Sequence, residues 1–98
     1  MSRLFSIHET AEAEVNEAAD FYDIESPGLG NVFLDDVERT IEAISQHPEA
    51  AQLLRGGLRK KPLLKFPYSL VYSVRPNEIR LLAVAHQKRR PFYWRVRI

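Results

Sequence analysis

The hydrophobic pattern of this chain changes its period near the middle, and this change limits the folds that the chain can adopt. Between residues 10 and 47, apolar side chains recur every three or four positions, which is typical of helices with one buried face. After Gly56-Gly57, apolar and polar side chains alternate, which is typical of strands in a sheet. Helices followed by strands indicate the α+β class, and residues 1–98 are enough for a single domain.

Two helices are expected in the first half, after a short strand over residues 4–7. Thr10 is a suitable N-cap for the first helix, and Ser26-Pro27-Gly28 ends it because Pro and Gly interrupt helices. Asn31 is expected to cap the second helix, which ends at His47-Pro48. The apolar stripes that these helices would bury are Ala11, Val15, Ala18, Ala19 and Tyr22 in the first and Phe33, Leu34, Val37, Ile41 and Ile44 in the second.

Three strands are expected in the second half, over residues 58–64, 68–74 and 79–85. Short connections that contain Pro separate them, which favours tight turns and an antiparallel meander. One face of the middle strand would consist of Leu70, Tyr72 and Val74. We therefore expect an N-terminal strand and a two-helix hairpin packed on a small, mostly antiparallel sheet.

The charge of the chain is divided between its halves. Residues 1–49 hold Arg3 and Arg39 against twelve acids, a net charge of −10, whereas residues 50–98 hold twelve Lys and Arg against Glu78 alone, a net charge of +11. Such a division indicates an electrostatic partner. Because the first helix contains only acidic charges, and like-charged pairs on a helix cost about 0.2–0.5 kcal/mol each, we expect it to depend on tertiary packing.

The composition excludes several classes of protein. The chain has no Cys, which excludes disulfides, thiolate metal sites and thiol nucleophiles. It has no apolar run of the ~20 residues that a membrane helix needs, and its N-terminus lacks the pattern of a signal peptide. We therefore expect a cytoplasmic protein with no membrane association. The His and acidic residues show no spacing typical of metal ligands, so neither a metal nor a cofactor is expected.

Basic residues gather in two places in the second half. The first group follows the last expected strand and leads into three aromatic residues, a mixture that can hold a phosphate backbone and stack on bases. Two alternatives remain open: the aromatic residues could cover the sheet, and the cations could form a solvated turn. The second group lies on and after the 58–64 strand, where it could form a positive patch or protect an edge strand. The candidate contact residues are Lys88, Arg89, Arg90, Tyr93 and Trp94 in the first group and Arg59, Lys60, Lys61 and Lys65 in the second.

His86 stands at the expected end of the last strand. An imidazole titrates near neutral pH and could act as a general acid or base, but the residues around it favour a structural hydrogen bond at the strand end. The chain offers no obvious activated nucleophile. An RNA 2′-hydroxyl can serve as its own nucleophile, so a ribonuclease could use His86, Arg89 and Tyr93 alone.

The order and spacing of these residues resemble the RelE/ParE toxin superfamily, particularly ParE-like plasmid-stabilisation proteins. In the second half the resemblance rests on residues 66–72 (FPYSLVY) and on His86, Arg89-Arg90-Pro91 and Tyr93-Trp94 within residues 83–94. In the first half it rests on Ala11, Glu14, Ala18-Ala19, Phe21-Tyr22, Gly28-Leu29-Gly30, Phe33, Val37, Ile41, Ile44 and Pro48. Together these segments cover nearly the whole chain.

The resemblance implies the toxin of a type II toxin–antitoxin system that is neutralised by a cognate antitoxin encoded nearby. ParE-like members are taken to inhibit DNA gyrase without being enzymes, whereas RelE-like relatives cleave mRNA on the ribosome. By position, His86, Arg89 and Tyr93 match functional residues of those relatives, and Lys61 and Lys65 match them more loosely. The chain departs from the common pattern at Gln87-Lys88, where Gly-Arg is frequent, and at Phe92, where Gly is frequent.

The leading hypothesis is therefore a non-enzymatic gyrase inhibitor in a hetero-oligomeric complex with its antitoxin. The alternatives are a ribosome-dependent mRNA endoribonuclease and a degenerate, non-toxic binding module. The positive second half suits an antitoxin segment that combines acidic residues with apolar anchors.

Overall fold

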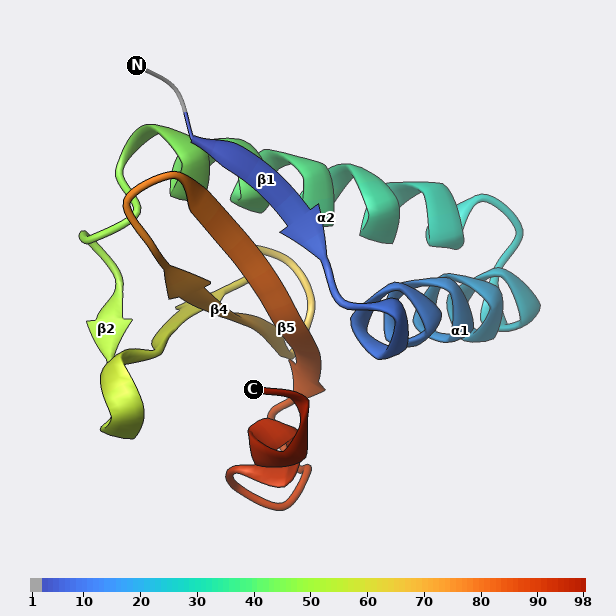
Figure 1. Ribbon diagram of the computed structural model, residues 1–98. Coiled ribbons are helices and arrows are strands. Elements are labelled where there is room, and N and C mark those ends of the chain that lie inside the picture. Colours follow the sequence, from blue (N-terminus) through green and yellow to red (C-terminus); the bar gives the residue numbers. More distant parts are fainter. Residues whose placement is uncertain (1–2) are drawn as a thin grey trace.

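The computed structural model describes residues 3–98 and places two helices on one face of a five-stranded sheet (Figure 1). The expected α+β class is confirmed. In chain order the elements are β1 (Leu4–Ile7), α1 (Glu9–Glu25), α2 (Leu29–Gln46), β2 (Gln52–Leu53), β3 (Arg59–Pro62), β4 (Tyr68–Val74) and β5 (Glu78–His86), with short 3₁₀ helices at Arg55–Gly57 and Tyr93–Arg97. Met1 and Ser2, which begin the N-terminal segment that lacks a signal-peptide pattern, lie outside the described residues.

The strands follow the order β1-β5-β4-β3-β2 across the sheet. The expected antiparallel meander of β3, β4 and β5 is confirmed, and β4 has the expected bounds. β3 is shorter than expected and β5 is longer, while the two-residue strand β2 was not predicted. β1 pairs with β5 in parallel, so the first strand of the chain lies beside the last.

The expected N-caps of both helices are wrong, whereas the expected end of the first helix at Ser26-Pro27-Gly28 is confirmed. α1 begins at Glu9, and the ring nitrogen Nδ1 of His8 accepts the N–H of Thr10 at 3.1 Å. α2 begins at Leu29 after Gly28, whose left-handed backbone (φ 91°) suits glycine. In the first turn of α2, the backbone N–H of Gly30 donates to Asp23 Oδ1 of α1 at 2.7 Å. The expected end of α2 before His47-Pro48 is confirmed.

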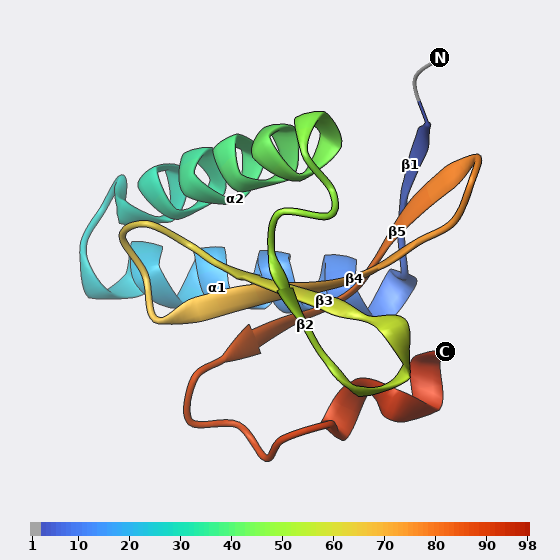
Figure 2. The same ribbon diagram turned by 90° about the vertical axis from the view of Figure 1, so that its left-hand side faces the viewer.

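The sheet has a hydrophobic core on each face. The first core lies between the sheet and the helices, where Leu70 and Tyr72 of β4 are fully buried, as their alternation predicted. The second core lies on the opposite face, where the C-terminal segment, residues 87–98, covers the sheet. In Figure 2, α2 lies above the strands and this segment lies below them. The buried members of the second core are Leu58, Val71, Leu82, Ala83, Ala85 and Trp94.

A buried carboxylate fixes the loop between β3 and β4. Asp36 of α2 is 1% exposed and accepts the backbone N–H groups of Leu64 and Lys65 at 3.2 and 2.7 Å. Buried polar groups are tolerated only when such bonds are made. Within residues 3–98, neither helix has the length and apolar character that crossing a bilayer requires.

Candidate functional site

The candidate site lies where β5 ends and the chain turns back toward the sheet. His86 is the last residue of β5, and its Nδ1 accepts the backbone N–H of Lys88 at 3.1 Å. The N–H of Arg89 donates to the carbonyl of His86 at 2.9 Å, which closes the turn. The ring of His86 also meets Tyr68 edge to face, with the ring centroids 5.0 Å apart. His86 therefore makes the structural hydrogen bond that was one of its two expected roles.

Tyr93 is engaged by the first helix. Its hydroxyl donates to Glu14 Oε2 at 2.8 Å and lies 3.4 Å from the carbonyl oxygen of Val84. Burial, followed by the hydrogen bond to the Glu14 carboxylate, raises the pKa of Tyr93 well above its ordinary value. The Tyr93 hydroxyl therefore keeps its proton, which it donates in a structural hydrogen bond to Glu14.

Glu14 joins three parts of the molecule. Its Oε1 accepts the N–H of Val84 at 3.0 Å, and both of its oxygens accept from the guanidinium of Arg97, at 2.8 and 3.2 Å. Arg97 also donates to the carbonyl of Leu82 at 3.1 Å. The side chains of Arg97 and Glu14 are only 10% and 13% exposed, so this ion pair is poorly screened by solvent. Although burial disfavours the charge on Arg97, the bonds to Glu14 leave the pKa of Arg97 raised.

Sequence reasoning missed both Glu14 and Arg97 as members of the site. A signal was present for Glu14, because it follows Ala11 by three positions and precedes Ala18 by four. This spacing puts the carboxylate on the apolar stripe of α1, where an unpaired charge would be unfavourable. An acidic residue on a buried stripe indicates a basic partner elsewhere in the chain.

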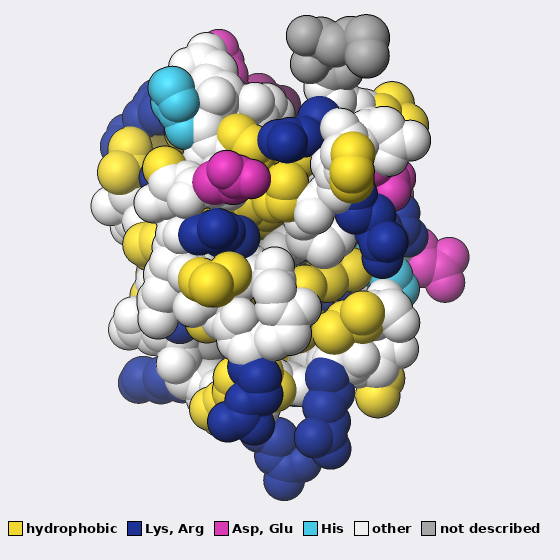
Figure 3. All heavy atoms as spheres, turned by 60° about the vertical axis from the view of Figure 1, so that its left-hand side comes forward, with side chains coloured by type: hydrophobic (Ala, Val, Ile, Leu, Met, Phe, Trp, Pro, Cys, Tyr) yellow, Lys and Arg dark blue, Asp and Glu magenta, His cyan; other side chains and the backbone are white. Residues whose placement is uncertain are grey.

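Arg89 connects His86 to Tyr93. Its guanidinium carbon lies 3.9 Å from the centre of the Tyr93 ring, a cation–π contact, and the residue is exposed. Lys88 and Arg90 are also exposed, and within residues 3–98 the Arg97–Glu14 pair is the only ion pair. Figure 3 shows Lys and Arg side chains gathered at the lower end of the molecule, which the C-terminal segment forms in Figure 1. The three expected catalytic candidates thus lie together, beside exposed cations.

The second basic group does not form one patch, because alternate residues of β3 face opposite sides of the sheet. Lys60 pairs with Val71 and shares its face with the C-terminal segment. Arg59 and Lys61 pair with Tyr72 and Leu70 and belong to the helix side, where Arg59 donates to the carbonyl of Ala51 at 2.9 Å. Lys65 lies in the loop that Asp36 holds. Of this group, the structure brings only Lys60 to the candidate site.

The aromatic residues fold back over the sheet, as one of the open alternatives expected. Trp94 is 6% exposed in the second core and packs against Phe92 and Tyr93, with ring centroids 5.7 and 5.3 Å away. Its ring therefore offers no free face to a base, which corrects the expected stacking contact at Trp94. Phe92 takes a left-handed backbone conformation (φ 62°) at the position where Gly is frequent among the chains that this one resembles.

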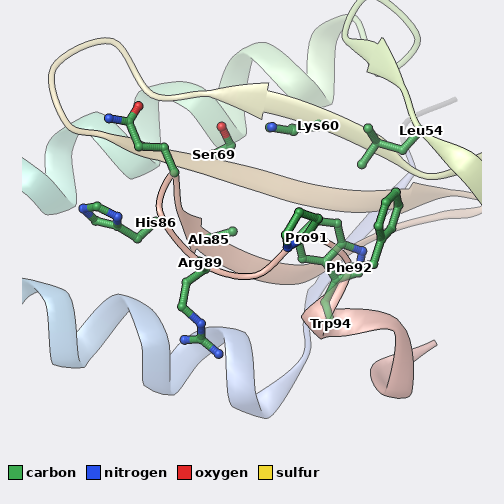
Figure 4. Close-up of a pocket in the computed structure, with 10 residues that line it drawn as sticks. Leu54, Lys60, Ser69, Ala85, His86, Arg89, Pro91, Phe92 and Trp94 are labelled. Atoms are coloured by element: carbon green, nitrogen blue, oxygen red, sulfur yellow. The ribbon is translucent and has the colours of Figure 1, made fainter.

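Two hollows meet at the candidate site. One, of about 180 Å³, lies between β3, β4 and the C-terminal segment and is drawn in Figure 4. The other, of about 220 Å³, lies between α1 and the end of β5, where Glu17, Phe21 and Tyr68 contribute to its walls. His86 and Arg89 line both hollows. No three His, Asp or Glu side chains in residues 3–98 are grouped closely enough to bind a metal ion.

One family model matches most of the chain, and a solved structure shares its fold. The model of the family described as "ParE toxin of type II toxin-antitoxin system, parDE" matches residues 5–91. The solved structure titled "Chromosomal ParDE TA system from P. aeruginosa" contains a chain with the same fold, at a TM-score of 0.77. The two chains share 19% identity, and the match covers 87% of this chain and 96% of that one. No curated protein matches the chain.

Proposed function

This chain belongs to the ParE toxin family of type II toxin–antitoxin systems, and on that premise we propose that it inhibits DNA gyrase through protein contact and is neutralised by a cognate antitoxin. The resemblance seen in the sequence is confirmed by the family match over residues 5–91. In this proposal the toxin acts in the cytoplasm, serves plasmid stabilisation, and is stored in a hetero-oligomeric complex with its antitoxin.

The hydrogen bond between Tyr93 and Glu14 is the observation that favours inhibition by protein contact over RNA cleavage. A ribonuclease needs groups that are free to move protons at the reacting atoms. The Tyr93 hydroxyl is held by Glu14, and Nδ1 of His86 is occupied by the N–H of Lys88. The Tyr93 hydroxyl and Nδ1 of His86 therefore serve the architecture of the C-terminal turn, which supports a role for this turn as a rigid contact surface.

Exposed cations on that turn are the proposed contact residues. Lys88, Arg89 and Arg90 project from a turn whose backbone is fixed by His86. Exposed, unpaired cations steer association with an acidic surface and add specificity. Lys60 extends the same charge across the face of the sheet that the C-terminal segment covers.

A supercoiling assay with purified gyrase tests the proposal. The toxin should inhibit gyrase, and Arg89→Ala should weaken the inhibition more than tenfold, since one charged contact is worth about 1.5–3 kcal/mol. Arg39→Ala, which changes an exposed cation of α2, is the matched control. Full supercoiling activity in the presence of toxin would overturn the proposal.

The same preparation separates the alternatives. Cleavage of mRNA in a reconstituted translation reaction, lost in His86→Ala, would support the endoribonuclease. A protein that affects neither gyrase nor translated mRNA, and does not slow growth when expressed, would support the degenerate binding module.

A further inference from the structure

The hollow beneath the C-terminal segment has a floor of small residues. Ser69 of β4 and Ala85 of β5 are register partners, and both are buried. Two small side chains side by side leave a space that larger side chains fill elsewhere in the second core. Figure 4 shows Lys60 and Leu54 on one side of this space and Pro91 and Phe92 on the other. The guanidinium of Arg89 points away from it, toward α1.

Two residues that line this hollow carry donors without a partner in the described part of the chain. The indole N–H of Trp94 is buried and makes no hydrogen bond with any residue from 3 to 98. Lys60, which is half-buried, forms no ion pair within the same part of the chain. Buried donors are nearly always satisfied in folded proteins, so an unsatisfied one beside a hollow calls for an acceptor from outside the chain.

The wall at Phe92 is held in a strained conformation. Its φ of 62° lies in the left-handed region, which is unfavourable for a bulky side chain. The ring is retained there by Trp94 on one side and by Arg55, whose guanidinium carbon is 5.5 Å from the ring centre. Local strain of this kind is concentrated at binding sites, where it positions a side chain for a ligand. Here it places an apolar ring at the wall of the hollow.

The size and chemistry of the hollow select its ligand. At about 180 Å³ it is smaller than the ~300–1,000 Å³ of sites that bind drug-sized molecules, so it suits one side chain rather than a nucleotide. An ammonium and a neutral N–H match a carboxylate, and the apolar walls match the methylene groups that carry it. Stacking of a base is not available, because the ring of Trp94 is buried.

We propose that this hollow receives the carboxylate of a Glu side chain in the antitoxin segment that covers this face of the toxin. The inference rests on the proposed neutralisation by an antitoxin and assigns it a site on this chain. The carboxylate pairs with Lys60 and accepts the indole N–H of Trp94, while the methylene groups lie between Leu54 and Phe92. The net charge of +11 in residues 50–98 favours such an acidic partner.

The single Trp of the chain gives a direct test, because its indole N–H has one resonance in the ¹⁵N–¹H spectrum of the full-length protein. The probe is the peptide acetyl-Leu-Glu-Leu-amide, compared with its Gln analogue, inorganic phosphate and a short single-stranded RNA. The Glu peptide should shift the Trp94 indole resonance saturably, and the Gln peptide should bind about tenfold more weakly.

Lys60→Met should abolish the shift, and Lys61→Met, a matched change on the opposite face of β3, should retain it. Lys60→Gln repeats the test should the Met variant give a poorly dispersed spectrum. An unmoved indole resonance, equal binding of both peptides, or a larger shift with RNA or phosphate would overturn the proposal. If the peptide does not bind but the toxin still inhibits gyrase, this site alone is rejected. If the peptide binds but the toxin has no effect on gyrase, only the gyrase target is rejected.

Discussion

The hydroxyl of Tyr93 donates to Glu14 Oε2 at 2.8 Å and joins residues 79 positions apart in the chain. The same carboxylate receives Arg97 and the N–H of Val84. One acidic side chain of α1 therefore holds the C-terminal segment against the sheet. The sequence predicted that α1 relies on tertiary partners, and Arg97 supplies the opposite charge that the helix itself lacks.

Glu14→Gln should destabilise the protein by about 3 kcal/mol, because it leaves the poorly exposed Arg97 without a counter-charge. Urea unfolding followed by circular dichroism measures the change. Glu17→Gln, on the exposed face of the same helix, should alter the free energy of unfolding by less than about 0.5 kcal/mol. Equal effects of the two substitutions would show that Glu14 has no special role.

Tyr93→Phe should cost about 1–2 kcal/mol of stability, since it removes one hydrogen bond to a charged acceptor and keeps the ring beneath Arg89. Under the proposed gyrase mechanism, inhibition should stay within about threefold of the wild type, because a stability loss of this size leaves the protein folded. A nuclease that used the hydroxyl would instead lose its activity. The measurement is the supercoiling assay, run at a temperature where both proteins are folded.

Tyr93 should also make stability depend on alkaline pH. Burial and Glu14 raise its pKa above the ordinary 10.0, so the folded protein holds this proton more tightly than the unfolded chain does. The resulting stability is complete below about pH 10 and declines as the pH rises toward the folded-state pKa. Urea titrations between about pH 8 and pH 11 should show a steeper decline for the wild type than for Tyr93→Phe. Burial raises the pKa of Tyr68 and Tyr72 as well, so only the difference between the proteins reports on Tyr93.

Asp36→Asn should destabilise the protein by about 2–3 kcal/mol. The amide can accept only one of the two N–H groups, from Leu64 and Lys65, that the carboxylate accepts. The neighbouring Asp35 is exposed, so Asp35→Asn is the matched control and should have little effect. Thermal unfolding of the two variants provides the comparison, and a similar midpoint for both would contradict the role assigned to Asp36.

Trp94→Ala should cost about 3–5 kcal/mol, the usual penalty for removing a large buried ring. Val96, two positions later, is 86% exposed, so Val96→Ala should change stability by less than about 0.5 kcal/mol. Amide hydrogen exchange should show that Trp94→Ala exposes the face of β5 around Leu82. Unchanged protection there would mean that the second core does not depend on this ring.

Elements whose signals are local could be predicted from the sequence, and elements that depend on distant partners could not. β4 was predicted with its correct bounds because seven residues alternate between two turns. The helix caps were missed because their acceptors, the ring of His8 and the carboxylate of Asp23, are not the residues that propensity favours. β2 is only two residues long, and the parallel pairing of β1 joins residues separated by most of the chain.

The parts of the candidate site that depend on local sequence could also be predicted. The strand-end position of His86 and the proximity of Arg89 to Tyr93 follow from a short stretch of sequence. The face on which each residue of β3 lies depends on register with β4, and register separated Lys60 from Arg59 and Lys61. The burial of Trp94 depends on the second core, which only the complete sheet creates.

The parallel pairing of β1 with β5 has a consequence for synthesis of the protein. A chain still attached to the ribosome has made β1 and the acidic helices long before β5 and Arg97 exist. Until then β1 cannot pair with β5, and Glu14 cannot form its ion pair with Arg97. The protein therefore completes its fold only when its last residues have left the ribosome, so the order of synthesis places the final step of folding at the C-terminal segment.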